Sequence, residues 1–264
     1  MSIRLAIHGA AGRMGQRLIA IGSADPELTL VGAWEAPNHP RLGQDAGALA
    51  GVGPISLPLS PATPGKVDVV IDFSVPAGAM SALEFCVNEK IPLVIATTGM
   101  EAHEQEQIRL ASRTLPVLWA PSMSLAVNLA MKLTAVASSA LKDHPSGADV
   151  EIIERHHRFK EDSPSGTALK FGQIVQSIMG QSVERHGREG RPGVRPHGEI
   201  GYHAVRVGDN PGEHTIVFGL LGETLEINVK ATNRDCYAHG ALAAAKFLVG
   251  KPAGLYSMND VLSI

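Results

Sequence analysis

Residues 3–20 read IRLAIHGAAGRMGQRLIA and predict a strand, a glycine-rich turn and a helix in succession. Small residues at such a turn let backbone amides approach a pyrophosphate at the N-terminus of the helix. Gly9, Gly12 and Gly15 are spaced G-x-x-G-x-x-G, however, not the commoner G-x-G-x-x-G. A tight turn that binds nothing would also use glycine. The segment therefore indicates a dinucleotide site that needs support from elsewhere in the chain.

The alternation of strand and helix continues to residue 118. Runs such as VDVVIDF (67–73) and PLVIATT (92–98) are almost continuously apolar. Such runs are typical of parallel strands that helices cover on both faces. We therefore predict an α/β fold with a Rossmann-like, doubly wound parallel sheet.

The pattern changes near Met123 and predicts a second domain. A long helix is expected first, with Leu125, Leu129, Leu133 and Val136 at helical spacing. Four extended runs follow, the middle two joined by a turn at GDNPGE and the last two by LLGE, which favours a mixed or antiparallel sheet. Between the first two runs lies a predicted helix, with Pro164 in its first turn and Gly180 at its C-terminal cap.

These patterns divide the chain into a dinucleotide-binding domain over residues 1–124, to which residues 234–264 return, and a second, α+β domain for substrate binding and oligomerisation over residues 125–233. Residues 186–198, HGREGRPGVRPHG, have no period, and we expect them to form a mobile, positively charged loop.

Composition limits the function classes. The 264 residues are 44% hydrophobic and carry 23 Lys plus Arg against 26 Asp plus Glu, a formal charge of −3, which argues against a nucleic-acid or membrane partner. No secretion signal is predicted, because the short apolar run at the N-terminus leads directly into the glycine-rich turn. No membrane span is predicted, because Asn128 and Lys132 interrupt the most apolar window. Cys86 and Cys236 are far apart and are expected to be packing residues of a cytoplasmic protein. The eleven histidines show no metal-ligand spacing, so no metal is expected.

Three groups of residues follow predicted strands where an open α/β sheet binds its ligand. Glu35 ends the second strand, 20 residues after Gly15, where a carboxylate can accept hydrogen bonds from ribose hydroxyls. Thr97 and Thr98 end another strand and are expected near the cofactor. Asp72, with Phe73, has two interpretations: a cofactor contact or a cap of the following helix.

The densest chemistry lies in residues 154–168, ERHHRFKEDSPSGTA. His156, His157 and Lys160 can exchange protons near neutral pH, which suits protonation of a substrate that receives hydride. Strand alternation places the two histidines on opposite faces, so they are assigned separate roles. The amides of Ser165, Gly166 and Thr167 at the next helix N-terminus suit a substrate carboxylate. The alternatives are surface histidines and a serine that only caps the helix.

Taken together, GAAGRMG, ATTG, EIIERHHRFKEDSPSGTA, IGYHAVRVGDNPGEHTIVF and GLYSMNDVL resemble the dihydrodipicolinate reductase family over nearly the whole chain. The resemblance implies NAD(P)H-dependent reduction of 4-hydroxy-tetrahydrodipicolinate to tetrahydrodipicolinate, in the diaminopimelate pathway of lysine biosynthesis. It also implies a cytoplasmic homotetramer. The partner is then a small dicarboxylate.

By this resemblance His156 is the proton donor or acceptor, Lys160 the proton donor and His157 a substrate contact, with Gly166 and Thr167 as the carboxylate cradle. The resemblance assigns cofactor binding to Gly9, Ala10, Ala11, Gly12, Arg13, Met14, Glu35, Ala96, Thr97, Thr98, Ala120, Pro121, Ser122 and Met123.

The chain departs from the family pattern in two places. Ala36 follows Glu35 where relatives often have an arginine that pairs with the 2′-phosphate of NADPH, so we expect NADH to be preferred or both cofactors to be used. Ser122, Met123 and Ala126 replace Asn, Phe and Gly, and no side-chain role is assigned to Met123. Two other functions stay open: another two-domain nicotinamide-dependent dehydrogenase, and a non-catalytic dinucleotide sensor.

Overall fold

The computed structural model describes residues 2–264, which fold into two compact units. Unit 1 contains the chain up to Leu125 together with Arg234–Ile264, and unit 2 contains Ala126–Asn233.

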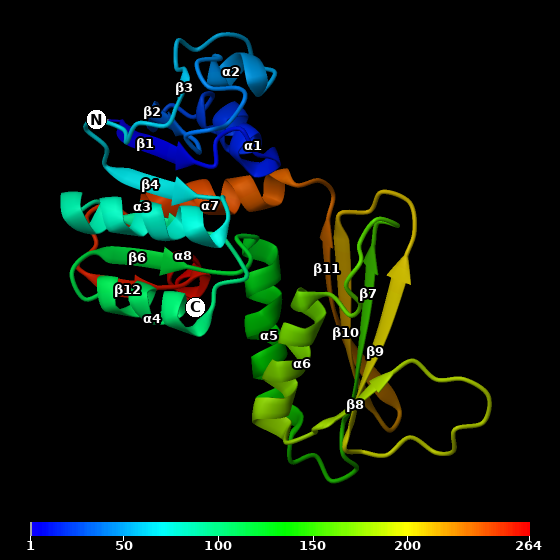
Figure 1. Ribbon diagram of the computed structural model, residues 1–264. Helices are drawn as coiled ribbons and strands as arrows, with labels where there is room; N and C mark the ends of the chain where they lie inside the picture. Colours follow the sequence, from blue (N-terminus) through cyan, green and yellow to red (C-terminus); the bar gives the residue numbers. More distant parts are fainter. Residues whose placement is uncertain (1) are drawn as a thin grey trace. The chain divides into compact units, whose positions relative to one another are not determined.

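Unit 1 is built on one seven-stranded sheet in the order β12-β6-β5-β4-β1-β2-β3 (Figure 1). Every neighbouring pair is parallel. This confirms the doubly wound α/β fold; the two-residue strand β3 and the C-terminal strand β12 were not foreseen. The strands are β1 (Ile3–His8), β2 (Leu28–Trp34), β3 (Leu59–Ser60), β4 (Val69–Asp72), β5 (Leu93–Ile95), β6 (Pro116–Trp119) and β12 (Gly254–Tyr256).

Helices cover both faces of this sheet, and alternate side chains of each strand enter two separate cores. Leu5 and Ile7 of β1 pack with helices α1 and α7, whereas Ala6 of the same strand faces the core under α3 and α4. Such double burial explains the almost continuous apolar runs of the sequence. The helices of unit 1 are α1 (Arg13–Gly22), α2 (Ala46–Leu49), α3 (Pro76–Glu89), α4 (Ala102–Ala111), α7 (Asp235–Leu248) and α8 (Met258–Leu262).

Unit 2 contains a mixed five-stranded sheet in the order β11-β10-β7-β9-β8. The expected hairpin of β10 with β11 is confirmed, but the turn at GDNPGE does not join neighbours, because β7 lies between β9 and β10. The loop between β9 and β10 is bonded to the residues after β7 instead: the amides of His157 and Arg158 donate to the carbonyls of Asn210 and Gly208. The strands are β7 (Asp149–His156), β8 (Val183–His186), β9 (Glu199–Arg206), β10 (Gly212–Leu220) and β11 (Glu223–Ala231).

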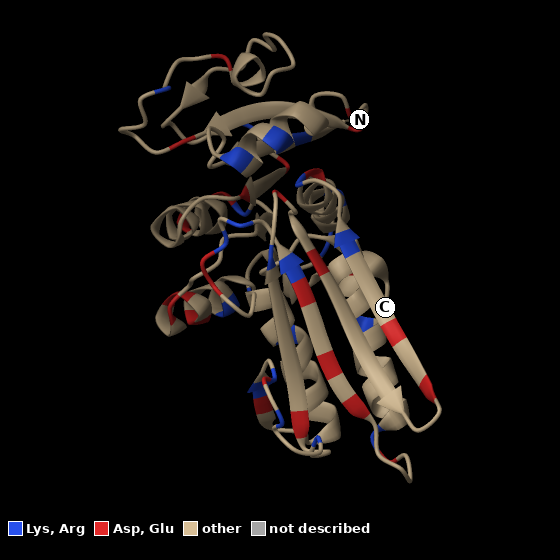
Figure 2. Ribbon diagram, turned by 90° about the vertical axis from the view of Figure 1, so that its right-hand side faces the viewer, with Lys and Arg blue, Asp and Glu red and all other residues tan. Residues whose placement is uncertain are grey.

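Helices α5 (Leu125–Leu141) and α6 (Gly166–Met179) cover one face of this sheet, and no helix of unit 2 covers the other, which we call the uncovered face (Figures 1 and 2). On α6, Phe171 and Val175 are fully buried and Gly180 takes the left-handed cap, as expected; Pro164 instead precedes the helix, which begins at Gly166.

The long helix predicted from Leu125 is confirmed as α5, but the apolar residues whose spacing predicted it are not its buried face. Its Leu129, Leu133 and Val136 are 42–55% exposed. The buried positions carry mostly smaller side chains, which let the helix backbone lie close to its neighbours. These are Val127, Ala130, Thr134, Ala137 and Ser138. Within residues 2–264, none of the helices combines the length and the apolar character that a bilayer crossing requires.

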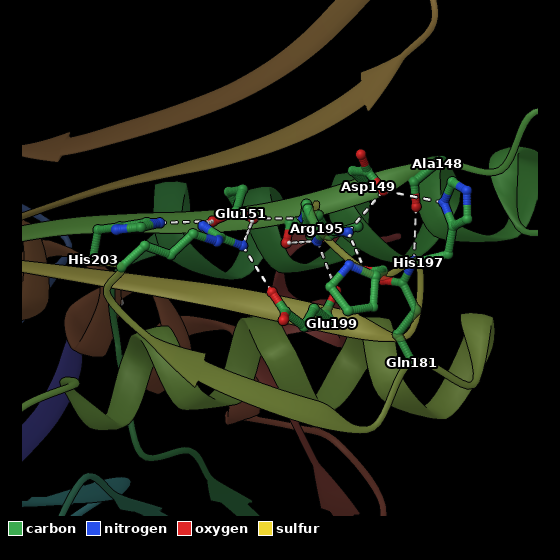
Figure 3. A network of polar contacts seen from close by, with 11 residues as sticks. Ala148, Asp149, Glu151, Gln181, Arg195, His197, Glu199 and His203 are labelled. Atoms are coloured by element: carbon green, nitrogen blue, oxygen red, sulfur yellow. Dashed lines mark hydrogen bonds and ion pairs between the residues drawn. The ribbon is translucent and has the colours of Figure 1, made fainter. Parts of the chain in front are cut away.

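The arginine-rich segment after β8 is held on the uncovered face by Glu151 of β7 (Figure 3). Arg188 donates two hydrogen bonds to the carboxylate at 2.7 and 2.9 Å, Arg195 donates one at 2.8 Å, and Nε2 of His203 lies 2.6 Å from it. Arg195 also donates to the main-chain carbonyls of Val150 and Glu199. Two charges of the expected mobile loop are therefore fixed by ion pairs.

Candidate functional site

The glycine-rich turn of unit 1 has space for backbone only. Gly9 has a φ of +76°, and a Cβ there would lie 2.4 Å from the carbonyl oxygen of Phe73. A Cβ on Gly15 would lie 2.2 Å from the carbonyl oxygen of Gly9. Helix α1 then begins at Arg13, after Gly12, which has no side chain to cap it. The turn thus presents the start of a helix without a covering side chain, the geometry that a pyrophosphate requires.

The end of β2 meets this turn. One carboxylate oxygen of Glu35 accepts a hydrogen bond from the amide of Ala11 at 2.9 Å, and the other accepts one from the amide of Ala36 at 2.9 Å. Ala10 and Ala11 are buried beneath, while Arg13 is exposed and Met14 half-buried. The structure therefore brings the predicted ribose-binding carboxylate to the predicted pyrophosphate-binding turn.

Asp72 is neither exposed nor a helix cap. Its carboxylate is fully buried, 2.7 Å from Nδ1 of His8, and accepts hydrogen bonds from the hydroxyls of Ser74 at 2.6 Å and Thr97 at 2.5 Å. The N-cap of α3 is Val75, with no side-chain hydrogen bond, so the capping interpretation was wrong. The carboxylate instead connects the ends of β1, β4 and β5.

The segment after β5 uses this network. The Thr97 hydroxyl donates to Asp72 and accepts from the amide of Ser74, so its proton is already committed within the protein. Ala96 is buried and Thr98 is exposed. A ligand at this position would contact the main chain and the exposed Thr98.

Of the predicted cofactor residues that follow β6, Ala120 and Met123 are buried in the core of unit 1, Pro121 is exposed and Ser122 is half-buried. A Cβ on Gly240 of α7 would lie 1.7 Å from the carbonyl oxygen of Met123, so α7 packs directly against this backbone. The Met123 side chain lies in the core, which agrees with the absence of a predicted ligand role for this side chain.

In unit 2, His156 ends β7 with only 8% of its surface exposed, and its Nδ1 lies 2.5 Å from a carboxylate oxygen of Glu154. Burial raises the pKa of Glu154, but hydrogen bonds from Arg206 and His156 outweigh it and lower that pKa overall. Burial lowers the pKa of His156, and the opposing effect of Glu154 is too small to restore it. At neutral pH the pair is therefore a carboxylate and a neutral imidazole.

The next residues form a turn with two further predicted groups. Lys160 donates hydrogen bonds from Nζ to both carboxylate oxygens of Asp162, at 2.7 and 2.9 Å. The lysine hydrogen bonds are the main cause of a lowered pKa of Asp162. The buried Nδ1 of His157 has no hydrogen-bond partner within residues 2–264. Unpaired buried nitrogens are uncommon in folded proteins, and a polar ligand that hydrogen-bonds to this one would satisfy it.

Helix α6 begins beside this pair. Ser165 is its N-cap: the hydroxyl accepts a hydrogen bond from the amide of Ala168 at 3.2 Å, and lies 3.1 Å from Nε2 of His214. The Ser165 amide donates to Glu154 at 3.1 Å, so the expectation that it faces the substrate was wrong. Gly166 is exposed, with no atom within 4 Å of where a Cβ would stand, and Thr167 is half-buried. Of the three amides predicted to bind an anion, those of Gly166 and Thr167 thus remain as candidates at the start of α6.

Sequence reasoning missed three residues of this cluster: Glu154, Arg206 and His214. Arg206 pairs in register with His156 across β9, and His214 pairs with Glu154 across β10. Burial lowers the pKa of His214 to about 4, which keeps its imidazole neutral. Glu154 precedes His156 by two residues and so shares its strand face, which was the only signal in the sequence. The other two follow from the strand order, which no local pattern gives.

The remaining reactive side chains form no second centre. Cys86 is buried, and burial raises the pKa of its thiol above the ordinary range. Burial also raises the pKa of Cys236. Among residues 2–264 there is no group of three or more His, Cys, Asp and Glu side chains placed to hold a metal ion.

Comparison with known proteins agrees with the motifs. A family model described as dihydrodipicolinate reductase, N-terminus, matches residues 3–123, and one described as dihydrodipicolinate reductase, C-terminus, matches residues 126–262. The chain belongs to the dihydrodipicolinate reductase family. It is 55% identical to the 4-hydroxy-tetrahydrodipicolinate reductase of Rhodopirellula baltica, over 99% of this chain and 96% of that protein. It is 43% identical to the Methylococcus capsulatus enzyme of the same name, over 100% and 99%.

A solved dihydrodipicolinate reductase with bound dipicolinate, from Paenisporosarcina sp. TG-14, has the same fold, with a TM-score of 0.77 and 25% identity, over 97% of this chain and 98% of that one. Membership in the dihydrodipicolinate reductase family makes the chain an oxidoreductase and confirms the resemblance drawn from the motifs. The N-terminal family model ends two residues before α5 begins, and the C-terminal one includes α7, which packs in unit 1.

Proposed function

We propose that the chain reduces 4-hydroxy-tetrahydrodipicolinate to tetrahydrodipicolinate with NADH or NADPH, in the diaminopimelate pathway of lysine biosynthesis. The carrying observation is the cluster at the end of β7. It places the buried His156–Glu154 pair next to a helix N-terminus whose first amides are open. A proton-transfer group beside an anion site suits a dicarboxylate that must be protonated.

Unit 1 has the features that a nicotinamide dinucleotide requires, and we assign it as the dinucleotide-binding domain. The amides at the start of α1 suit the pyrophosphate, the Glu35 carboxylate suits ribose hydroxyls, and the segments 96–98 and 120–123 border the ends of β5 and β6. When bound, the cofactor supplies the hydride. The candidate residues are Gly9, Ala10, Ala11, Gly12, Arg13, Met14, Glu35, Ala96, Thr97, Thr98, Ala120, Pro121, Ser122 and Met123.

Unit 2 is assigned as the substrate-binding domain. The open amides of Gly166 and Thr167 would hold one carboxylate of the substrate at the N-terminus of α6, and the unpartnered Nδ1 of His157 would give a further polar contact. The bound dipicolinate of the Paenisporosarcina protein is a ring dicarboxylate of the same class, which supports this assignment.

Proton transfer divides between two residues. Lys160, which donates hydrogen bonds from Nζ to Asp162, would supply the proton that accompanies hydride transfer. His156, neutral in the free protein, carries its proton on Nδ1 toward Glu154 and offers Nε2 as the acceptor. It would therefore take up a proton during loss of water from the hydroxylated ring and return it later.

We propose NADH preference or dual use of cofactors. Ala36 follows the ribose-binding carboxylate and donates its amide to Glu35, so this position offers no cation to a 2′-phosphate.

We also propose that the chain is a cytoplasmic homotetramer assembled through unit 2. The support is the uncovered face of the five-stranded sheet, where Ile153 and Val205 are 42% and 40% exposed. Apolar side chains on an open sheet face favour burial against another copy.

The test is steady-state oxidation of NADH and, separately, NADPH, with the cyclic substrate made fresh by the preceding synthase from pyruvate and aspartate semialdehyde. We expect turnover with NADH at least as efficient as with NADPH. Turnover strongly favouring NADPH would leave the reductase function intact and reject the cofactor argument. No turnover with either would reject the reductase function in favour of a dinucleotide sensor or another dehydrogenase.

A further inference from the structure

The Glu154 carboxylate contacts two parts of the proposed proton-transfer site directly, the His156 imidazole and the start of α6. It is only 1% exposed, yet its two oxygens receive four hydrogen bonds. Oε2 accepts from His156 at 2.5 Å and from Arg206 at 2.7 Å, and Oε1 accepts from Arg206 at 2.7 Å and from the Ser165 amide at 3.1 Å. One buried anion thus joins the imidazole to the helix that carries the anion site.

Arg206 extends these contacts to the third part. The nitrogen that donates to Oε1 also donates to the carbonyl of Asp162 at 2.7 Å. Asp162 in turn receives the Lys160 ammonium. The Glu154–Arg206 ion pair therefore touches His156, the start of α6 and the turn that carries Lys160. A bidentate pair with additional hydrogen bonds is the arrangement that can hold a buried charge.

An ionised carboxylate is only an acceptor, so the proton on the neutral imidazole of His156 must lie on Nδ1. Nε2 is then left with its lone pair and faces Gly212, where a Cβ would lie 2.9 Å away. Any side chain at that position would meet the nitrogen, and Gly212 also has a φ of +153°. The glycine keeps Nε2 clear of side chains.

From these contacts we infer that Glu154, held by Arg206, is a positioning residue: it selects the Nδ1–H tautomer of His156 and keeps the imidazole in register with the anion site. The inference rests on the proposed function in that it takes His156 as the proton-exchanging group. Because Glu154 is only 1% exposed, the inference gives it no contact of its own with substrate or cofactor.

The principal variant is Glu154→Gln, which keeps the size of the side chain but can donate as well as accept. We expect kcat to fall about 100-fold or more, with a smaller rise in the KM for the dicarboxylate, because an amide no longer enforces the tautomer. Glu151→Gln is the matched control. Glu151 lies on the same strand and is also paired with an arginine, but its side chain is on the opposite face of the sheet. The folded control variant should therefore keep kcat within about twofold of wild type.

The pH profile separates positioning from a purely structural role. The charged or titratable groups around His156 are Glu154 on its own strand, Lys160 on the next turn, Arg206 on β9 and His214 on β10. Glu154 raises the pKa of His156, whereas Lys160 and Arg206 lower it. Removing the Glu154 charge should therefore move the acid limb of kcat/KM to lower pH. A variant that only loosens the site would raise KM and leave this limb in place.

One further measurement decides the inference if Glu154→Gln does not fold. A neutron crystal structure of the wild-type protein near pH 7 should show the His156 proton on Nδ1. A proton on Nε2, or a Glu154→Gln protein with wild-type kcat and acid limb, would overturn the inference. The neutron result is independent of turnover, so it also distinguishes this failure from failure of the proposed reaction.

Discussion

Glutamine at position 151 would remove the charge at the centre of the network on the uncovered face of unit 2 without changing the size of the side chain. Burial alone raises the pKa of Glu151, but hydrogen bonds from Arg188, Arg195 and His203 outweigh it and lower the pKa from 4.5 to about 2. Each unit of pKa corresponds to about 1.4 kcal/mol, so this carboxylate contributes at most about 3.4 kcal/mol to stability. Solvent screening around Arg188, whose side chain is 27% exposed, reduces the expected loss to about 2 kcal/mol.

The sign of the pH dependence follows from the lowered pKa. The stabilisation is complete well above pH 4.5, where the unfolded carboxyl is also ionised, and it is lost as the pH falls toward the folded value of about 2. We therefore expect the difference in free energy of unfolding between wild type and Glu151→Gln to be largest at pH 7 and to shrink by more than half near pH 3.

The assay is denaturant unfolding of both proteins at fixed protein concentration between pH 7 and pH 3, with Glu226→Gln as the control. Glu226 is exposed on β11 of the same sheet and forms no ion pair in the described chain, so its replacement should cost less than about 0.5 kcal/mol. Amide exchange over residues 187–198 should also accelerate in Glu151→Gln. A difference that stays constant from pH 7 to pH 3, or a loss no larger than that of the control, would refute the reasoning.

Three other substitutions test separate parts of the molecule. Lys160→Ala should lower kcat by about 100-fold or more while leaving NADH binding intact, and unchanged turnover would remove its role as proton donor. In Gly166→Ala the new Cβ meets no protein atom within 4 Å, so the free energy of unfolding should be unchanged. The methyl group would stand at the proposed carboxylate site and should raise the substrate KM; an unchanged KM would place the carboxylate elsewhere. Asp72→Asn should cost about 2–4 kcal/mol in denaturant unfolding, because it replaces one of the two acceptor oxygens of a fully buried network with an NH2 donor and removes the charge. A loss below about 1 kcal/mol would show that His8, Ser74 and Thr97 find other partners.

The parts of the fold that the sequence predicted are those that local periodicity encodes. The apolar runs of β1, β4 and β5 and the glycine-rich turn were sufficient for the doubly wound sheet, because parallel strands are buried on both faces. The short elements α2, β3, β8 and β12 were missed. Each is five residues or fewer, too short for a period to appear. The leucine spacing was sufficient to predict helix α5, but it did not show which side chains the helix buries, because packing uses mostly the smaller ones between the leucines.

The site shows the same division. His156, Lys160, Gly166 and Thr167 lie close in sequence, and proton-exchange chemistry next to a helix start could be predicted from one segment. Arg206 and His214 come from strands β9 and β10, and their positions depend on β7 lying between those strands. Local signals favoured a hairpin of β9 with β10. A true hairpin would have excluded β7 from its position between them, and the carboxylate of Glu154 would have lost the cross-strand register with His214 that the observed strand order provides. Alternation within β7 therefore sets the contact between His156 and Glu154, whereas long-range strand order, which is set by the whole sheet, decides that Arg206 and His214 join them.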